Sequence, residues 1–293
     1  MRRRNVLKGV AIGLSSLVVP AVLGRGATGK VGPGTADALA DLEQRSGGRL
    51  GVSMLDTATG RRIGHRGDER FLMCSTFKLL AVAAVLARVD HGLERLGRHV
   101  VYDRTVLLDY APVTSRHLGA PGMTIAELCE AAITLSDNTA ANLLLSSMDG
   151  PDTVTAFVRG LGDPVTRLDR TEPELNRGSP DDLRDTTTPN AMLVTMHKLL
   201  LGSALSSGSR SHLLAWLRAC NTGAGKLRAG LPSGWEVGDK TGSGSQGETN
   251  DVAIIWPPGH GPLLVTAYYA GSPLSLPTRN AVLARVGRIA AAI

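Results

Sequence analysis

Residues 75–89 read Ser-Thr-Phe-Lys-Leu-Leu-Ala-Val-Ala-Ala-Val-Leu-Ala-Arg-Val. The apolar positions of this stretch fit a helix that is buried, so we predict a core helix here. Before it, residues 49–56 alternate apolar and polar side chains. After a turn at 57–60, residues 61–66 predict the partner strand of a hairpin. The stretch therefore marks the point where the chain changes from strands to helices.

The chain after this stretch stays helical and then returns to strands. Thr124 and Glu127 form a capping box, and Thr188 is predicted to cap a helix that has Pro189 at its first position. We take Thr35 as the cap of the first helix of the chain. Helices are predicted over residues 35–44, 139–147, 153–161, 189–201, 209–219 and 277–293, and strands over 237–242, 251–256 and 263–270.

This order of elements predicts an α/β fold with two lobes. The α/β lobe is expected from both termini, about residues 31–68 and 217–293, and the all-helical lobe from about residues 69–216. The length of 293 residues suits one large domain or two lobes around a shared cleft. Residues 167–188 are different, since they are charged, contain proline and show no periodicity. A loop of that length in a compact domain is usually functional or disordered.

The composition excludes several classes of protein. Apolar residues make up 43% of the chain and charged residues 20%, which allows a sizeable core and excludes disorder as the default. Aromatic residues make up only 3%, which argues against a surface that stacks nucleic-acid bases. The net charge of +6 equals that of the first thirty residues, which hold six basic and no acidic side chains. Residues 31–293 therefore carry no net charge, and we expect no nucleic-acid partner.

Residues 1–30 have the pattern of a secretion signal. Three arginines at residues 2–4 precede an apolar stretch at 10–23, which is shorter than the roughly 20 residues that a membrane span needs. The order Arg-Arg-Asn-Val-Leu-Lys at residues 3–8 resembles a twin-arginine export signal, and no clear cleavage site precedes residue 30. We expect a secreted or periplasmic protein that is free of the membrane after cleavage. An uncleaved membrane anchor is the alternative.

The cysteines and histidines do not form a recognisable metal site. Cys74, Cys129 and Cys220 are an odd number, so at least one thiol stays free in an exported chain. No Cys-x-x-Cys pair occurs and the seven histidines are scattered, so a zinc site has no support. We interpret the cysteines as small buried hydrophobes and expect no metal and no cofactor.

The motif Ser75-x-x-Lys78 suits nucleophilic catalysis. Helical spacing puts the serine hydroxyl and the lysine amine on one face, roughly 5–6 Å apart at Cβ. A serine becomes a nucleophile only when a nearby base takes its proton, and the helix N-terminus adds a positive field. Taken alone, the motif is more typical of a serine cap followed by a solvated lysine than of a catalytic pair.

Two further motifs carry polar groups to a cleft. Ser136-Asp137-Asn138 stands at a break between two helical stretches, where it can present a hydroxyl and an amide. Lys240-Thr241-Gly242, followed by Ser243, comes at the end of a predicted strand and suits a substrate carboxylate. Each one singly is also typical of a helix cap or an exposed strand end.

In this order, separated by about 60 and about 100 residues, the three motifs resemble those of serine-reactive penicillin-recognising enzymes. Residues 167–176, with Glu172 and Asn176 four apart, resemble the Ω-loop of class A β-lactamases. The resemblance runs from about residue 35 to the C-terminus. It implies an antiparallel sheet flanked by helices from both termini, plus an all-helical lobe. The implied activity is hydrolysis of the β-lactam amide bond of penicillins and some cephalosporins, which confers β-lactam resistance.

The resemblance implies a role for each catalytic residue. Ser75 becomes acylated, Lys78 accepts a proton, and Ser136 passes a proton to the ring nitrogen as it leaves. Whether Lys78 or Glu172, through a water, is the base for acylation stays open. Glu172 with Asn176 is implied to hold the water that hydrolyses the acyl-enzyme.

Binding roles follow from the same resemblance. The N–H groups of Ser75 and Ser243 are implied to form an oxyanion hole, and Asn138 to bind the side-chain amide of the substrate. Lys240 and Thr241, next to Gly242, are implied to bind its carboxylate, and Tyr110 to line the entrance of the cleft. Arg170 and Asp185 are expected to pair and pin the loop, and Glu172–Pro173 is expected to be a cis peptide.

The sequence departs from the family pattern at the carboxylate site. A second arginine often supports this site, but Thr249 stands at one of its positions, and Asn280 at another with Arg279 one place off. Lys226 falls where some members carry that arginine. We therefore predict that Lys226 substitutes for it, with Arg228 as a weaker candidate.

The cysteines depart from the family as well. Cys129 aligns with half of a disulfide whose other position is Val82, and Cys74 with half of one whose other position is Gly244. Neither bridge can form, so we expect reduced cysteines. Without a disulfide between positions 74 and 244, one argument for carbapenem hydrolysis is lost.

Two other functions share part of this pattern. A D,D-peptidase has the first three motifs, and a penicillin-binding sensor is acylated without turnover. Glu172 argues against both, because a base aimed at the acyl-ester is what turns acylation into hydrolysis. We expect a monomer that acts on a small-molecule β-lactam.

Overall fold

The computed structural model of the chain describes residues 1, 34–179 and 181–293. The twin-arginine pattern and the apolar stretch of the predicted export signal lie outside these residues. Within the described part, no helix is both long and apolar enough to span a membrane. The helices are α1 Thr35–Ser46, α2 Phe77–Asp90, α3 Ile125–Thr134, α4 Asn138–Ser146, α5 Pro151–Gly160, α6 Pro189–Leu200, α7 Ser207–Arg218 and α8 Leu276–Ala290.

Five strands form one antiparallel sheet in the order β2-β1-β9-β8-β7. They are β1 Arg49–Asp56, β2 Arg62–His65, β7 Glu236–Ser243, β8 Thr249–Trp256 and β9 Leu263–Ala270. β1 pairs with β9 along its whole length, so the N-terminal and C-terminal parts of the chain meet in the middle of the sheet. β7, which carries the Lys-Thr-Gly motif, is an edge strand. The predicted antiparallel sheet built from both ends of the chain is confirmed.

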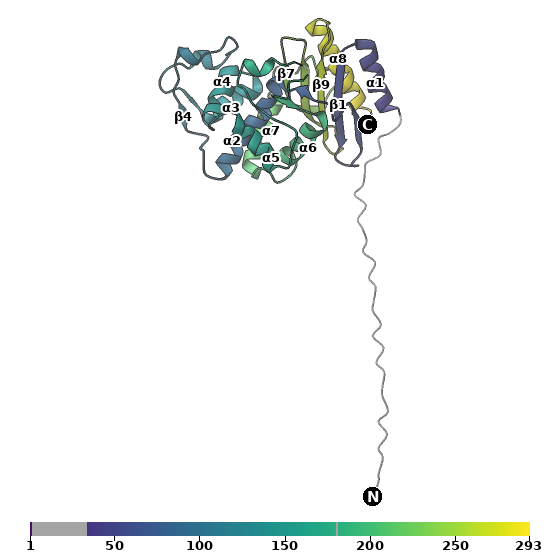
Figure 1. Ribbon diagram of the computed structural model, residues 1–293, viewed down its shortest axis with the longest axis horizontal. Coiled ribbons are helices and arrows are strands. Elements are labelled where there is room, and N and C mark those ends of the chain that lie inside the picture. The colour runs from purple at the N-terminus through teal and green to yellow at the C-terminus, as the bar shows by residue number, and fades with distance from the viewer. Residues whose placement is uncertain (2–33, 180) are drawn as a thin grey trace.

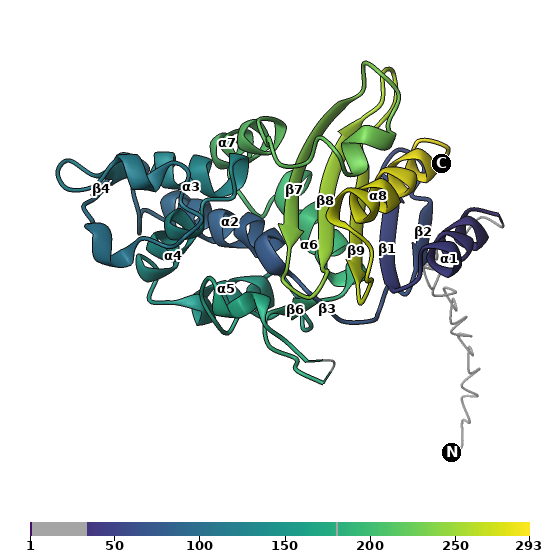
Figure 2. The same cartoon turned by 90° about the horizontal axis from the view of Figure 1, so that it is seen from above.

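Helices cover both faces of this sheet (Figure 2). α1 and α8 lie on one face, where Leu39 and Val286 pack in a core with strand residues such as Val52. The other face belongs to a larger core that includes α2 and α6, and α2–α5 extend to the end of the molecule away from the sheet (Figure 1). Eleven of the fourteen residues of α2 are buried, which confirms the predicted core helix.

Four local predictions can be compared with the described backbone. The helix predicted from Ser75 begins two residues later, because Cys74–Thr76 forms a 3-10 turn before α2. The prediction that Thr35 caps α1 is wrong: Gly34 is the N-cap, with φ 100° and no side-chain bond. The capping box of Thr124 with Glu127 is confirmed, and so is the Thr188 cap, which accepts the N–H of Ala191.

Two short ladders did not appear in the sequence patterns. β3 Phe71–Leu72 pairs with β6 Thr186–Thr187, and β4 His99–Val100 pairs with β5 Met123–Thr124. Pairs of residues are too short to show the alternation of a strand. The first ladder matters for the site, because it ties the segment before Ser75 to the end of the 167–188 loop.

Candidate active site

Ser75 lies in the 3-10 turn that leads directly into α2. Cys74, just before it, has φ 45°, a left-handed conformation that is uncommon for a non-glycine residue. Asn250 of β8 donates its side-chain amide to the carbonyl oxygens of Leu72 at 2.9 Å and Met73 at 3.1 Å. These contacts fix the Ser75 hydroxyl at a helix N-terminus, where the backbone N–H groups and the helix dipole favour negative charge.

Lys78, one turn into α2, is completely buried and lies among four polar groups. Its Nζ is 3.1 Å from Ser75 Oγ, 2.8 Å from the Ser136 carbonyl oxygen, 2.6 Å from Asn138 Oδ1 and 3.1 Å from Glu172 Oε1. Burial lowers the pKa of Lys78, and the charge of the Glu172 carboxylate offsets part of this effect. The predicted Ser75–Lys78 pair is therefore in hydrogen-bonding contact.

Ser136 and Asn138 stand at the start of α4 in a loop that Asp137 holds rigid. Ser136 has φ 59°, again left-handed, and the buried Asp137 caps α4 by accepting the N–H of Ala140. Asp137 also accepts the backbone N–H groups of Val113 and Thr114. The middle residue of the motif thus fixes the loop, while its neighbours face the cleft.

The Lys-Thr-Gly motif occupies the last half of β7. Lys240 is fully buried, and its Nζ donates to Ser136 Oγ at 3.2 Å and to the Thr241 carbonyl oxygen at 2.9 Å. Burial lowers the pKa of Lys240 to about 8, and the positive charge of Lys78 acts in the same direction. Thr241 Oγ1 lies 2.6 Å from the hydroxyl of Thr222. Ser136 is thus held between the two lysines.

Lys226 lies beside the same strand, in the turn before the 3-10 segment Leu227–Gly230. It is only 4% exposed, and its Nζ donates to the carbonyl oxygens of Gly242 and Asn250, both at 3.0 Å. Ser243 Oγ is 3.4 Å away. Burial lowers the pKa of Lys226. The ammonium group therefore lies at the end of the strand where the sequence predicted a second cation.

The other candidates for that cation are engaged elsewhere. Arg279 donates from Nε to Thr249 Oγ1 at 3.0 Å and from Nη1 to the Leu274 carbonyl oxygen at 2.9 Å. Arg228 forms an ion pair with buried Asp239, at 2.5 Å. Of the cations considered, Lys226 alone is among the residues that line the cleft.

Glu172 contacts both Ser75 and Lys78. Its Oε1 accepts the hydroxyl of Ser75 at 3.2 Å, and its Oε2 accepts the side-chain amide of Asn176 at 2.6 Å. The side chain of Asn142 holds the Glu172 backbone at both its N–H (3.0 Å) and its carbonyl (2.9 Å). The peptide between Glu172 and Pro173 is cis, as predicted. Asn142 carried no motif signal, and sequence reasoning missed it.

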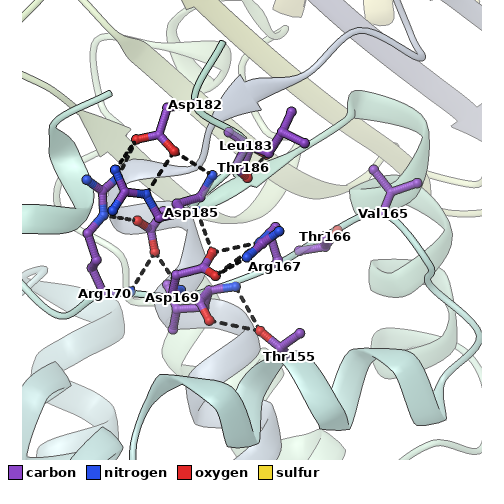
Figure 3. Close-up of polar contacts among 12 residues, drawn as sticks. Thr155, Val165, Thr166, Arg167, Asp169, Arg170, Asp182, Leu183, Asp185 and Thr186 are labelled. Carbon is purple, nitrogen blue, oxygen red and sulfur yellow. Dashed lines mark hydrogen bonds and ion pairs between the residues drawn. The ribbon is translucent and has the colours of Figure 1, made fainter. Parts of the chain in front are cut away.

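The neck of the loop is closed by charged side chains (Figure 3). Arg170 Nε lies 2.5 Å from Asp185 Oδ2, so the predicted pair is confirmed. The carboxylates of Asp169 and Asp185 each accept the backbone N–H of the other residue, at 3.1 and 2.8 Å. Arg167 pairs with Asp169. Against the effect of burial, the hydrogen bond from Arg167 lowers the pKa of Asp169.

One cleft of about 320 Å³ collects the predicted substrate-binding residues. It is lined by Ser75, Tyr110, Ser136, Asn138, Asn176, Lys226, Thr241, Gly242 and Ser243, together with Thr222, Leu276 and Asn280. Lys78, Glu172 and Lys240 are buried behind this lining. Sequence reasoning missed Thr222 and Leu276, which stand outside any motif. A larger cavity of about 800 Å³ holds none of the motif residues.

The three cysteines are free and buried. Burial raises the pKa of each thiol. None of the three thiols pairs with another, including that of Cys74, which immediately precedes Ser75.

Known proteins are similar to this chain in sequence and in fold. Residues 34–293 match the family described as "Beta-lactamase enzyme family". The chain is 45% identical to Beta-lactamase OXY-1 of Klebsiella oxytoca, over 94% of each chain. It is 49% identical to Beta-lactamase CTX-M-8 of Citrobacter amalonaticus, over 86% of each. The solved structure of an ancestral class A β-lactamase is 62% identical with a TM-score of 0.86, covering 87% of this chain and 98% of that one.

The family match covers residues 34–293, and these relatives cover 86–94% of the chain. The chain therefore belongs to the beta-lactamase enzyme family, as a class A β-lactamase that hydrolyses β-lactams and confers resistance to them.

Proposed function

We propose that Ser75 attacks the β-lactam carbonyl carbon and becomes acylated, and that water activated by Glu172 then hydrolyses the acyl-enzyme. One observation carries this proposal: Ser75 Oγ is 3.1 Å from Lys78 Nζ and 3.2 Å from Glu172 Oε1. A single serine hydroxyl thus has both an amine and a carboxylate within hydrogen-bonding distance. A nucleophile beside its base is the arrangement that covalent catalysis requires.

Acylation needs a proton path from Ser75 to the ring nitrogen. The proton leaves Ser75 Oγ for Lys78, or for Glu172 through a water, and burial of Lys78 favours its neutral, accepting form. Ser136 Oγ is 3.3 Å from Lys78 Nζ and 3.2 Å from Lys240 Nζ. We propose that Ser136 passes a proton to the nitrogen as the C–N bond breaks.

The developing oxyanion needs donors that are already in position. The N–H groups of Ser75 and Ser243 are proposed for this role, since both residues line the cleft. Ser75 also lies in the turn at the N-terminus of α2. Losing one such donor costs ~3–4 kcal/mol of transition-state stabilisation.

The cleft offers separate groups for the two ends of a β-lactam. Lys240, Thr241 and Lys226 cluster along β7 and are proposed to bind the ring carboxylate. Asn138 and Asn176 are proposed to bind the acyl-amide side, with Tyr110, half exposed at the rim, covering the entrance. Penicillins and some cephalosporins are the proposed substrates.

Deacylation distinguishes this proposal from its rivals. Glu172 accepts the Asn176 amide on one oxygen and lies against Ser75 with the other. A water held between these groups has a base on one side and the acyl-ester on the other. A D,D-peptidase or a sensor that stays acylated would not need this carboxylate.

We also propose that the enzyme is exported and acts as a monomer. The pattern of residues 1–30 supports export, and their twin-arginine order supports that route. The catalytic chain then comprises residues 31–293, with an α/β lobe of about 31–68 and 217–293 and a helical lobe of about 69–216.

The first experiment compares residues 31–293 with the Glu172→Gln variant on a chromogenic cephalosporin, with intact mass recorded for both. The parent is expected to turn over steadily, and the variant to accumulate an adduct on Ser75. A stable adduct on the parent as well would favour a sensor or a peptidase. No adduct on either protein would contradict the assignment of Ser75.

A further inference from the structure

A groove of about 500 Å³ lies between α1 and α8, the first and last helices of the described chain. Figure 1 shows these two helices side by side on one face of the sheet. The catalytic cleft meets α8 near its start, at Leu276 and Asn280, whereas the groove follows the end of this helix, from Arg285 to Ala292. Among the described residues, none lines both spaces. The volume of the groove falls within the range of about 300–1,000 Å³ that is usual for small-ligand sites.

The floor of the groove is apolar. Leu42 of α1 is 4% exposed and belongs to the core on this face of the sheet. Ile289 of α8 packs against the same core and also lines the groove. Ala38 and Ala292 complete the apolar lining with small side chains. A ligand in this groove therefore removes apolar surface from water, which favours the binding of a hydrocarbon group.

Three exposed arginines border this floor: Arg45 from α1, and Arg285 and Arg288 from α8. Arg285 and Arg288 are three residues apart on one helix, a spacing at which like charges repel each other. α8 holds no acidic residue, and within residues 34–179 and 181–293 neither of these two arginines forms an ion pair. Arg45 pairs with Asp41, one turn away, at 3.3 Å and with both side chains exposed. The groove therefore carries an excess of positive charge.

The other parts of the chain do not supply the negative charge that this groove attracts. Residues 2–33 contain six basic and no acidic side chains, and residue 180 is a proline. A second copy of the chain, packed about a twofold axis, would bring the same arginines face to face. Charge complementarity therefore favours a separate anion, and the apolar floor favours an anion that carries a hydrocarbon chain.

We propose that the groove between α1 and α8 binds the anion of a long-chain fatty acid. Arg285 and Arg288 bind the carboxylate, because guanidinium groups match a carboxylate through paired, charge-assisted hydrogen bonds. The acyl chain lies along Leu42 and Ile289, where it extends the apolar core of this face. This site is separate from the catalytic cleft, and the proposal does not depend on the proposed function.

The test uses isothermal titration calorimetry on the protein purified after expression of the full-length gene, with intact mass to define its N-terminus. Dodecanoate is the probe, and we expect saturable binding with a Kd of about 0.1 mM, the strength typical of burying one acyl chain. Acetate has the same head group without the chain, and dodecyltrimethylammonium has the same chain with a cationic head group. Both should bind at least about tenfold more weakly, because each lacks one of the two parts that the groove recognises. Vesicles of anionic phospholipid are tested alongside as a second source of an anionic head group on acyl chains.

A pair of double variants tests the arginines. Arg285→Gln with Arg288→Gln is expected to weaken dodecanoate binding by about tenfold or more, because the carboxylate loses its charged donors. Arg95→Gln with Arg104→Gln removes the same charge from two exposed positions of the helical lobe. This matched control should leave Kd within about twofold of the parent, since it changes only the net charge.

Substitutions at two alanines of α1 test the groove itself. Ala38→Glu places a carboxylate in the groove, where it competes for the arginines, and should remove dodecanoate binding. Ala40→Glu adds the same charge two positions along, on another side of the helix, and should leave binding unchanged. The melting temperature of every variant should stay near that of the parent, which shows that a loss of binding is not a loss of the fold.

Equal affinity for dodecanoate and dodecyltrimethylammonium, or equal losses in the two double variants, would overturn the role of Arg285 and Arg288. Acetate that binds as tightly as dodecanoate would overturn the role of the apolar floor. Unchanged dodecanoate binding in Ala38→Glu would place the ligand elsewhere on the protein and contradict the proposal. Binding to the phospholipid vesicles without saturable binding of dodecanoate would also overturn it, in favour of a membrane surface.

Discussion

The two halves of the active site are held in place by different forces. Lys78 and Lys240, which we propose for acylation and for binding the substrate carboxylate, come from α2 and β7, and both are completely buried within regular elements. Glu172, which we propose for deacylation, comes from a loop in which residues 167–179 and 181–188 hold one helical segment, the 3-10 turn Glu174–Asn176. That loop is held by Asn142 and by ion pairs such as Arg170 with Asp185.

This difference predicts that the two chemical steps respond differently to perturbation. Packing of apolar side chains is not directional and depends little on salt or pH. Hydrogen-bonded ion pairs require ionised carboxylates and lose strength in salt where they are exposed. We therefore expect the rate of acylation to depend little on salt and pH. We expect the rate of deacylation to depend on both.

The largest effect should come from Lys78→Ala, which changes the half of the site that lies in buried helices and strands. Removing a proton-transfer group typically costs 10²–10⁴-fold, and we expect acylation to slow by about 10³-fold. Glu172 also loses the cation 3.1 Å away, so the melting temperature should fall as well. Pre-steady-state acylation of a chromogenic substrate measures the step. A variant that acylates normally but deacylates slowly would contradict the assignment of Lys78 to acylation.

Arg170→Ala should slow deacylation selectively, because it removes a contact that holds the loop of Glu172 in place. It leaves the carboxylate of Asp185, which is completely buried, without its cation. Misplacing Glu172 by about 1 Å would slow deacylation by about 10²-fold. Acylation should change by under about threefold, so intact mass should show an accumulated adduct.

Arg184→Ala is the matched control in the same loop. Its pair with Asp182 is more than half exposed on the arginine side, and such pairs are worth about 0–1 kcal/mol. Both rates should stay near those of the parent. Equal losses in the two arginine variants would mean that the loop depends on net charge and not on the buried pair.

Lys240 should make substrate binding in the buried half of the site depend on pH. Its pKa of about 8 means that it is cationic below that pH and neutral above it. KM for carboxylate-bearing substrates should therefore rise about fivefold between pH 8 and 9, following the loss of the protonated form. Lys240→Arg should remove this rise, because a guanidinium stays charged throughout. An identical KM profile in both proteins would assign the titration to another group.

An effect as modest as that of the pH change is expected from Lys226→Ala. Lys240 remains at the carboxylate site, so KM for penicillins should rise about fivefold with kcat almost unchanged, the pattern of lost uniform binding. Steady-state kinetics measure both constants. An unchanged KM would show that Lys226 only ties the Gly242 and Asn250 carbonyls together.

Motifs and periodic segments predicted most of this molecule, because their signal is local. The strand 49–56, the capping box of Thr124 and the Ser75–Lys78 pair all depend on residues a few positions apart, and each is present as predicted. The cap of α1 was wrong, because the backbone of Gly34 took the cap position in place of the Thr35 side chain.

Contacts between distant segments could not be predicted in the same way. Asn142 holds the Glu172 backbone across 30 residues, and Asn250 holds Leu72 across 178. Neither asparagine belongs to a motif, and asparagine is common in loops and caps. The side chains that gather at the cleft were therefore predictable from motifs, while several of the groups that position them were not.

The pairing of β1 with β9 has a consequence for biosynthesis. β1 ends at Asp56, and its neighbour in the sheet ends at Ala270, close to the C-terminus. At about 5–20 residues per second, a ribosome needs roughly 10–40 s to make the chain between them. Throughout that time the β1–β2 hairpin lacks its main neighbour, and a two-stranded hairpin is at best marginally stable alone. The newly made chain therefore cannot complete its sheet until β9 has been made, which leaves a long interval in which chaperones can meet an unfinished protein.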